Sequence, residues 1–166
     1  SHCPMVRHLL YVQTLHYIIT GYYYCAPKDA TRLAALCLLE RYGVPEHDDD
    51  AIALQISNIS KHIFELVPGT IIKQQTSAEW TSQIFNIYNN LQKDPNDPHA
   101  MDDAKGLYLS MVENLGSTRD QFLCTLFRCK KNVNQDCVVA INADNIRVLD
   151  GATFEKLEEF ELNQIF

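Results

Sequence analysis

The hydrophobic and polar positions divide the chain into a first part with helical spacing and a second part with strand-like spacing. The most apolar stretch, residues 33–39, consists of seven consecutive apolar side chains flanked by good helix formers. At about 100° per residue, seven such side chains point in every direction around a helix, so other elements must enclose it. Pro27 and Asp29 mark its start and Gly43 its end. The pattern predicts a central helix over residues 27–43.

A second helix is predicted before it, over residues 4–20, and ends at Gly21. Three tyrosines, residues 22–24, then lead into the central helix. Tyrosines at a short turn between helices typically cap a core with their hydroxyl groups in water, and a ligand platform or phosphorylation site is the alternative. The broad apolar face expected to be buried on residues 4–20 consists of Val6, Leu9, Leu10, Val12, Leu15, Ile18 and Ile19.

Three more helices are predicted after the central one. Isoleucines at positions 52, 56, 59 and 63 are spaced by four, three and four residues, which favours one amphipathic helix. Residues 76–92 open with a capping box formed by Thr76 and Glu79 and carry Trp80 as an expected core anchor. The last helix has a start signal at residues 97–98 and is closed by Gly116.

From about residue 117 the pattern changes to short segments rich in β-branched or aromatic residues. Helices followed by consecutive strands indicate a second structural unit, so we expect an α+β protein. Its predicted domains are a helical bundle over residues 1–117 and an incomplete antiparallel sheet over residues 118–166. The expected strands are residues 121–129, 136–142, 145–149 and 157–165, and the expected turns are 130–134, 143–144 and 150–151.

Composition and charge exclude several functional classes. The 166 residues carry a formal net charge of −7, which argues against a general nucleic-acid binder because phosphate contacts need clustered cations. The apolar N-terminal segment is interrupted by Arg7, His8 and Gln13, so it fits neither a membrane span nor a signal peptide. Six cysteines are few for a disulfide scaffold of this length, which favours reduced thiols and a cytoplasmic protein.

Candidate chemistry is sparse, and we expect no catalytic residue, no metal site and no cofactor. Cys25 precedes the central helix, where the helix dipole could lower a thiol pKa, but the pattern places no histidine beside it, and an ordinary loop thiol is the alternative. Cys124, Cys129 and Cys137 lack the close pairs of structural zinc sites. One cationic cluster stands out at the first hairpin of the expected sheet, at Arg128, Lys130 and Lys131.

The order of these motifs resembles that of FERM domains, most closely those that follow a myosin-tail-homology segment in unconventional myosins and some kinesins. The helical second lobe of that family is similar to Asp29-Ala30, Leu33-Ala34-Ala35-Leu36, Tyr42-Gly43, Val67-Pro68, Trp80, Ile84, Tyr88, Ala104-Lys105, Tyr108-Leu109, Val112 and Leu115. The start of its pleckstrin-homology-like third lobe resembles Phe122 to Phe127, Val139 to Asn142, Ile146, Val148-Leu149, Phe160 and Ile165. Ala140 and Asn145 stand where that family usually has glycines.

The resemblance implies a non-catalytic interaction module that links a cytoskeletal or motor protein to cargo, membrane receptors or filaments. It implies protein partners, such as receptor tails and cytoskeletal proteins, and a cytoskeleton-associated location. It also implies that the hairpin cations touch an acidic partner or, weakly, an anionic membrane at about 1 kcal/mol each, with a solvated turn as the alternative. Two other functions stay open: a small-molecule carrier like the acyl-CoA-binding proteins that this bundle resembles, and a cysteine-dependent enzyme using Cys25.

Overall fold

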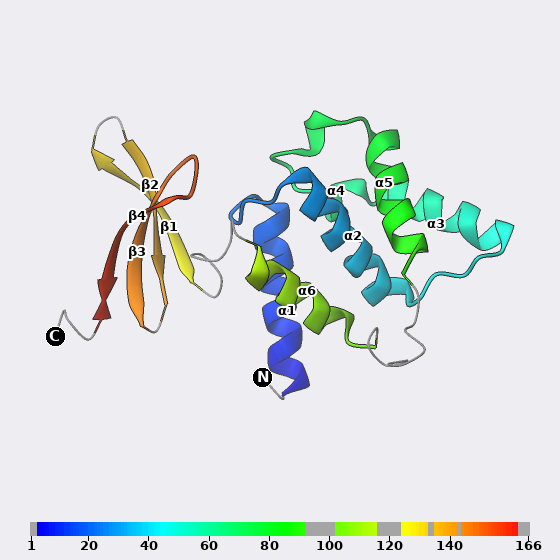
Figure 1. Ribbon diagram of the computed structural model, residues 1–166, viewed down its shortest axis with the longest axis horizontal. Coiled ribbons are helices and arrows are strands. Elements are labelled where there is room, and N and C mark those ends of the chain that lie inside the picture. Colours follow the sequence, from blue (N-terminus) through cyan, green and yellow to red (C-terminus); the bar gives the residue numbers. More distant parts are fainter. Residues whose placement is uncertain (1–2, 92–101, 116–123, 133–134, 143, 163–166) are drawn as a thin grey trace.

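The computed structural model describes residues 3–91, 102–115, 124–132, 135–142 and 144–162 and shows a helical unit beside a sheet (Figure 1). The sheet is antiparallel with strand order β1-β2-β3-β4. This arrangement confirms the α+β prediction. The described elements are α1 (Pro4–Ile19), α2 (Pro27–Tyr42), α3 (Asp49–Lys61), α4 (Ile63–Leu66), the 3₁₀ turn η1 (Ile72–Gln74), α5 (Ser77–Asn89), α6 (Ala104–Asn114), β1 (Thr125–Asn132), β2 (Gln135–Ile141), β3 (Asn145–Asp150) and β4 (Lys156–Glu161).

Helix α2 is enclosed as its sequence predicts and runs through the middle of the helical unit (Figure 1). It packs against α4, α5 and α6. Six of the seven side chains at residues 33–39 are buried, and Leu36 is partly buried against the same core. Ala34 and Ala35 have no exposed surface, so neighbouring side chains lie directly on the helix backbone. The helix is therefore the core element around which the unit is built.

Helix α5 confirms the predicted capping box and core anchor. The Thr76 hydroxyl oxygen accepts a hydrogen bond from the Glu79 backbone N–H at 3.2 Å, and the Glu79 carboxylate accepts one from the Thr76 N–H at 2.7 Å. One turn in, Trp80 is fully buried and its indole N–H donates to the Ile72 carbonyl at 2.9 Å. The cap fixes where the helix begins, and that start directs Trp80 into the core.

The predicted buried face of α1 is wrong in its N-terminal half. Val6, Leu9 and Val12 are exposed, whereas Tyr11 and Thr14 are buried. Helix α6 packs along the Tyr11 side of α1, where the rings of Tyr11 and Tyr108 meet edge to face at 5.2 Å, and Arg7 pairs with Asp103 at 2.6 Å. Because both sides of α1 carry apolar residues, their spacing alone did not select the buried side.

Several element boundaries also differ from the predictions. The helix expected through Ile63 is interrupted at His62, whose φ of −105° and ψ of 19° separate α3 from α4. Strand β1 continues to Asn132, through residues expected to form a turn. The side chain of Asp103 caps α6 by accepting from the Gly106 N–H, while the start signal at residues 97–98 and the domain boundary at 117/118 lie outside the described residues.

The strand register gives the sheet two different faces. Residue Val138 pairs with Arg128 on one side and Leu149 on the other, and it lies in a small buried core with Cys124, Ala140 and Leu149. Side chains alternate along strands, so the neighbouring positions lie on the opposite face. That second face includes Phe127, which is 52% exposed.

Candidate functional site

The three cations predicted as a contact site all lie on β1, but each has a different partner. The Arg128 guanidinium carbon lies 5.7 Å from the ring centroid of Tyr22, in the helical unit, and 6.0 Å from that of Phe154. Phe154 adopts a positive φ of 59°, and its ring packs on the small sheet core. Arg128 thus provides a cation–π contact between the two units, worth about 0.5–1 kcal/mol at an exposed site.

The two lysines of the cluster are each matched by a carboxylate of the same chain. The Lys130 Nζ atom lies 4.0 Å from Asp136 Oδ1, and Lys131 forms an ion pair with Glu158 on β4. Exposed ion pairs of this kind contribute about 0–1 kcal/mol. Their partners reduce the local positive potential that would attract an anionic surface. A contact of Arg128, Lys130 and Lys131 with a membrane or acidic partner stays a prediction.

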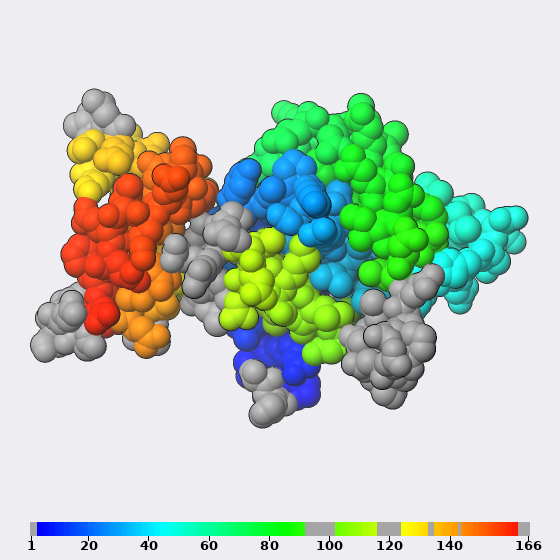
Figure 2. Space-filling model, in the orientation of Figure 1, coloured from blue at the N-terminus to red at the C-terminus, as the bar shows by residue number. Residues whose placement is uncertain are grey.

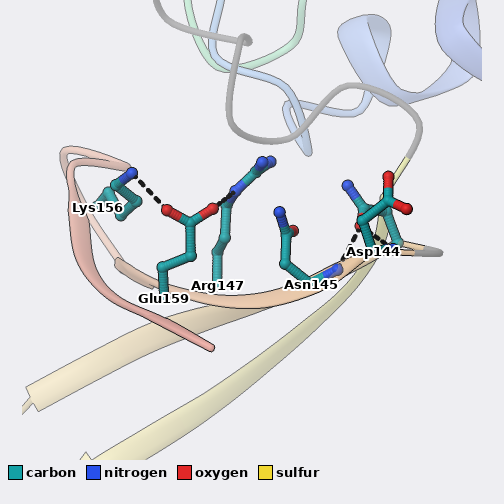
Figure 3. Close-up of polar contacts among 6 residues, drawn as sticks. Asp144, Asn145, Arg147, Lys156 and Glu159 are labelled. Carbon is teal, nitrogen blue, oxygen red and sulfur yellow. Dashed lines mark hydrogen bonds and ion pairs between the residues drawn. The ribbon is translucent and has the colours of Figure 1, made fainter. Parts of the chain in front are cut away.

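A second polar cluster joins β3 to β4 and was not singled out from the sequence. Arg147 Nε donates to one Glu159 carboxylate oxygen at 2.8 Å, and Lys156 Nζ donates to the other at 2.7 Å (Figure 3). The hydrogen bond from Lys156, followed by that from Arg147, lowers the pKa of Glu159. Nearby, the backbone N–H groups of Asp144 and Asn145 both donate to the Asn142 side-chain oxygen at 2.9 Å and shape the β2–β3 turn. Arg147 and Glu159 are opposite each other in the β3–β4 register, so their ion pair joins the edge strand to its neighbour at a paired position.

The largest exposed apolar side chains of α1 lie on one side of the helix. Met5, Leu9 and Val12 are 64%, 60% and 47% exposed, and their spacings of four and three residues keep them together on the helix surface. Val6, also exposed, borders them. Figure 2 shows the N-terminal half of α1, in blue, projecting from the rest of the helical unit. We call Met5, Val6, Leu9 and Val12 the α1 apolar face.

The structure places Cys25 in an environment that does not suit a nucleophile. The side chain is 2% exposed and its thiol lies 3.6 Å from the Ala26 carbonyl oxygen. Burial, with a smaller effect of the Asp29 carboxylate, raises the pKa of Cys25 to about 12. A thiolate is the reactive form of cysteine, and a raised pKa makes it scarce at neutral pH.

A cavity of about 220 Å³ lies between α2, α3 and α5, with Leu38, Ile59 and Tyr88 among its lining residues. It is smaller than the roughly 300–1,000 Å³ typical of small-molecule sites. Among the described residues, no three His, Cys, Asp or Glu side chains converge as metal ligands. In the same part of the chain, we find no helix with the length and apolar character that crossing a membrane requires.

Comparison with known proteins decides the family. The sequence-family model of the FERM central domain matches residues 1–118, which is most of the chain. The chain belongs to the FERM family. Its match confirms the resemblance of the helical unit to the second FERM lobe. Among curated proteins, this FERM chain is 26% identical over 143 residues to myosin-VIIa of Drosophila melanogaster; the match covers 86% of the chain and 6% of that protein.

Solved FERM structures share the fold of both units. The chain superimposes on the human myosin 7b C-terminal MyTH4-FERM domain, solved in complex with the harmonin-a PDZ3 domain, with a TM-score of 0.67 and 21% identity over 92% of the chain and 29% of that structure. For the complex of the FERM and C-terminal domains of Drosophila Merlin, the TM-score is 0.66 and the identity 18%, and the match covers 95% of this chain and 48% of that one. For the MyTH4-FERM MF2 domain of Dictyostelium discoideum myosin VII, the TM-score is 0.65 and the identity 21%, and the match covers 94% of this chain and 28% of that one. The FERM chain thus spans less than half of each of these relatives.

Proposed function

We propose that this FERM chain is a protein-interaction module of a myosin-like, cytoskeleton-associated protein, linking it to cargo, receptor tails or filaments. The observation that carries the proposal is the match to myosin-VIIa, which spans 86% of the chain. Two structural neighbours support protein partners, since myosin 7b was solved with a PDZ domain and Merlin with its C-terminal domain. The buried Cys25 thiol, with its raised pKa, does not favour a cysteine-dependent enzyme.

The α1 apolar face is the surface through which we expect the chain to bind a protein partner. Fully burying a Leu, Val or Met side chain contributes about 1.5–3 kcal/mol, and these side chains still expose about half of their surface in the chain alone. Apolar side chains at helical spacing are the anchors by which helices engage apolar grooves. Part of this gain offsets the cost of association, so the face serves as the centre of a larger contact.

A paired substitution tests this surface. Leu9 on α1 and Leu54 on α3 are 60% and 61% exposed, so an aspartate at either position disturbs the fold to a similar, small extent. The chain is immobilised and incubated with a purified set of candidate proteins: actin filaments, receptor cytoplasmic tails and PDZ domains of the harmonin type. We expect at least one to bind, and Leu9→Asp to weaken that binding about tenfold or more, the equivalent of about 1.4 kcal/mol.

The matched variant, Leu54→Asp, distinguishes a failure of the α1 apolar face as the binding surface from a failure of the proposed interaction function. Leu54→Asp is expected to bind as the unsubstituted chain does. Equal weakening by both variants would contradict the assignment of the α1 apolar face while leaving an interaction function in place. Failure of every candidate protein to bind, at concentrations where the myosin 7b domain binds harmonin-a PDZ3, would contradict the interaction function itself.

A further inference from the structure

Cys129 and Cys137 lie directly opposite each other on β1 and β2, with their sulfur atoms 3.2 Å apart. The register places Cys137 between β1 and β3 in the middle of the sheet. Both thiols are free, Cys129 is exposed, and Cys137 is 4% exposed. We propose that this pair is a reversible redox site, in which glutathione disulfide converts the two thiols into a Cys129–Cys137 disulfide across the β1–β2 hairpin.

The backbone explains why the bond would be reversible. Asp136 and Asn142 form their backbone hydrogen bonds with β3, because the Gly151 N–H donates to the Asp136 carbonyl and the Asn142 N–H to the Asn145 carbonyl. The N–H and C=O groups of successive residues point to opposite sides of a strand, so the N–H and C=O of Cys137 point toward β1. Cys129 and Cys137 are therefore a hydrogen-bonded pair of the β1–β2 ladder. Opposite residues at such hydrogen-bonded positions have Cα atoms about 5.5 Å apart, within the range of disulfides. Their Cβ atoms, at about 4.5–5.5 Å, are farther apart than the about 3.8 Å that a disulfide prefers. The hairpin must tighten to form the bond, which favours its reduction.

The two cysteines differ in the way that a sequential exchange requires. Cys129 is the accessible sulfur, and the hydrogen bond between the two thiols raises the pKa of Cys137, which keeps the proton on the buried partner. An open hollow of about 580 Å³ includes both cysteines in its lining, together with Arg128, Lys130 and Asp136.

The exchange balances without a further reactant. The Cys129 thiolate attacks one sulfur of glutathione disulfide, the bond between the two glutathione sulfurs breaks, and one glutathione leaves with the proton from Cys129. Deprotonated Cys137 then attacks the Cys129 sulfur and expels the second glutathione, which takes the proton from Cys137. The protein loses two protons and two electrons, and glutathione disulfide is reduced to two glutathione molecules.

Mass spectrometry of the full chain tests the proposal. The chain is treated with glutathione disulfide, free thiols are blocked with N-ethylmaleimide, and trypsin then cleaves after Arg128, Lys130 and Lys131. We expect the Cys129-Lys130 dipeptide linked to residues 132–147, and its release by dithiothreitol. Linkage of Cys129 to another cysteine, linkage only between two chains, or full blocking of both thiols would overturn the proposal.

Three single variants follow the order of the steps. Cys137→Ser leaves the first step intact, so a mixed disulfide with glutathione is expected to accumulate on Cys129. Cys129→Ser removes the accessible thiol, so Cys137 is expected to stay blocked by N-ethylmaleimide. Cys3→Ser, at an exposed thiol outside the hairpin, is expected to leave the linked peptide unchanged. Absence of the mixed disulfide in Cys137→Ser, with far-ultraviolet circular dichroism showing a folded chain, would contradict the assigned order.

Discussion

The hydroxyl group of Tyr108 offers a test of the helical core in which removing an atom stabilises the protein. Tyr108 is fully buried, and among the described residues its hydroxyl has no hydrogen-bond partner. Leaving a buried polar group unsatisfied costs about 1–3 kcal/mol. Tyr108→Phe keeps the edge-to-face packing on Tyr11 and removes that group. We expect the free energy of unfolding to rise by about 1 kcal/mol and Tm by about 2–4 °C.

Tyr11 is the matched control because its ring meets that of Tyr108 and its hydroxyl has a polar neighbour. Burial, followed by the neighbouring Cys37 thiol, raises the pKa of the Tyr11 hydroxyl. Tyr11→Phe removes the interaction of this hydroxyl with the thiol, so we expect a decrease of about 0.5–1.5 kcal/mol, opposite in sign to the effect at Tyr108. Urea denaturation followed by circular dichroism measures both variants. A loss of stability in Tyr108→Phe equal to that in Tyr11→Phe would refute the assignment of an unsatisfied hydroxyl.

Three further predictions concern other parts of the chain. Ala35→Leu inserts volume into a fully buried position on α2 and is expected to lower the free energy of unfolding by about 1–3 kcal/mol in urea denaturation. Thr76→Ala removes the α5 cap and is expected to cost about 1 kcal/mol near neutral pH. The hydrogen bonds that the Thr76 backbone N–H and then its hydroxyl donate lower the pKa of Glu79, so the stability they add is present above the unfolded carboxyl pKa of about 4.3 and is lost as pH falls through the lower folded value. Because Thr76→Ala keeps the backbone N–H and removes only the hydroxyl, thermal melts of the two chains should approach each other only in part over that pH range. A double-mutant cycle of Arg128→Ala and Tyr22→Ala is expected to give a coupling of about 0.5–1 kcal/mol, and no coupling would contradict the contact between the units.

The features that could be predicted from sequence are those set by local pattern. A helix that is apolar on every side is stable in water only when other elements enclose it, so both α2 and its enclosed position were predicted. The capping box at Thr76 and Glu79 is equally local, and both of its hydrogen bonds are present. The change from helical to strand spacing predicted the order of the two units because it depends on residue type over short windows.

Most of the features that were missed depend on contacts between distant segments. The buried side of α1 is selected by Tyr108, about a hundred residues away in the chain, and both sides of α1 are apolar enough to be buried. Ile59 and Ile63 keep helical spacing across the break at His62, which hides that break. The pairing of Cys129 with Cys137 requires the β1–β2 register, which β1 reaches by extending into the expected turn.

Residue-resolved hydrogen exchange of the backbone amides tests most directly whether an enclosed α2 organises the helical lobe. Buried elements exchange only through large openings, whereas exposed elements exchange through local ones. We expect the amides of residues 33–39 to be the slowest of the helical unit, and those in the first half of α1, next to the exposed Leu9, to exchange much faster. Exchange of residues 33–39 at the rate of the first half of α1 would contradict the account.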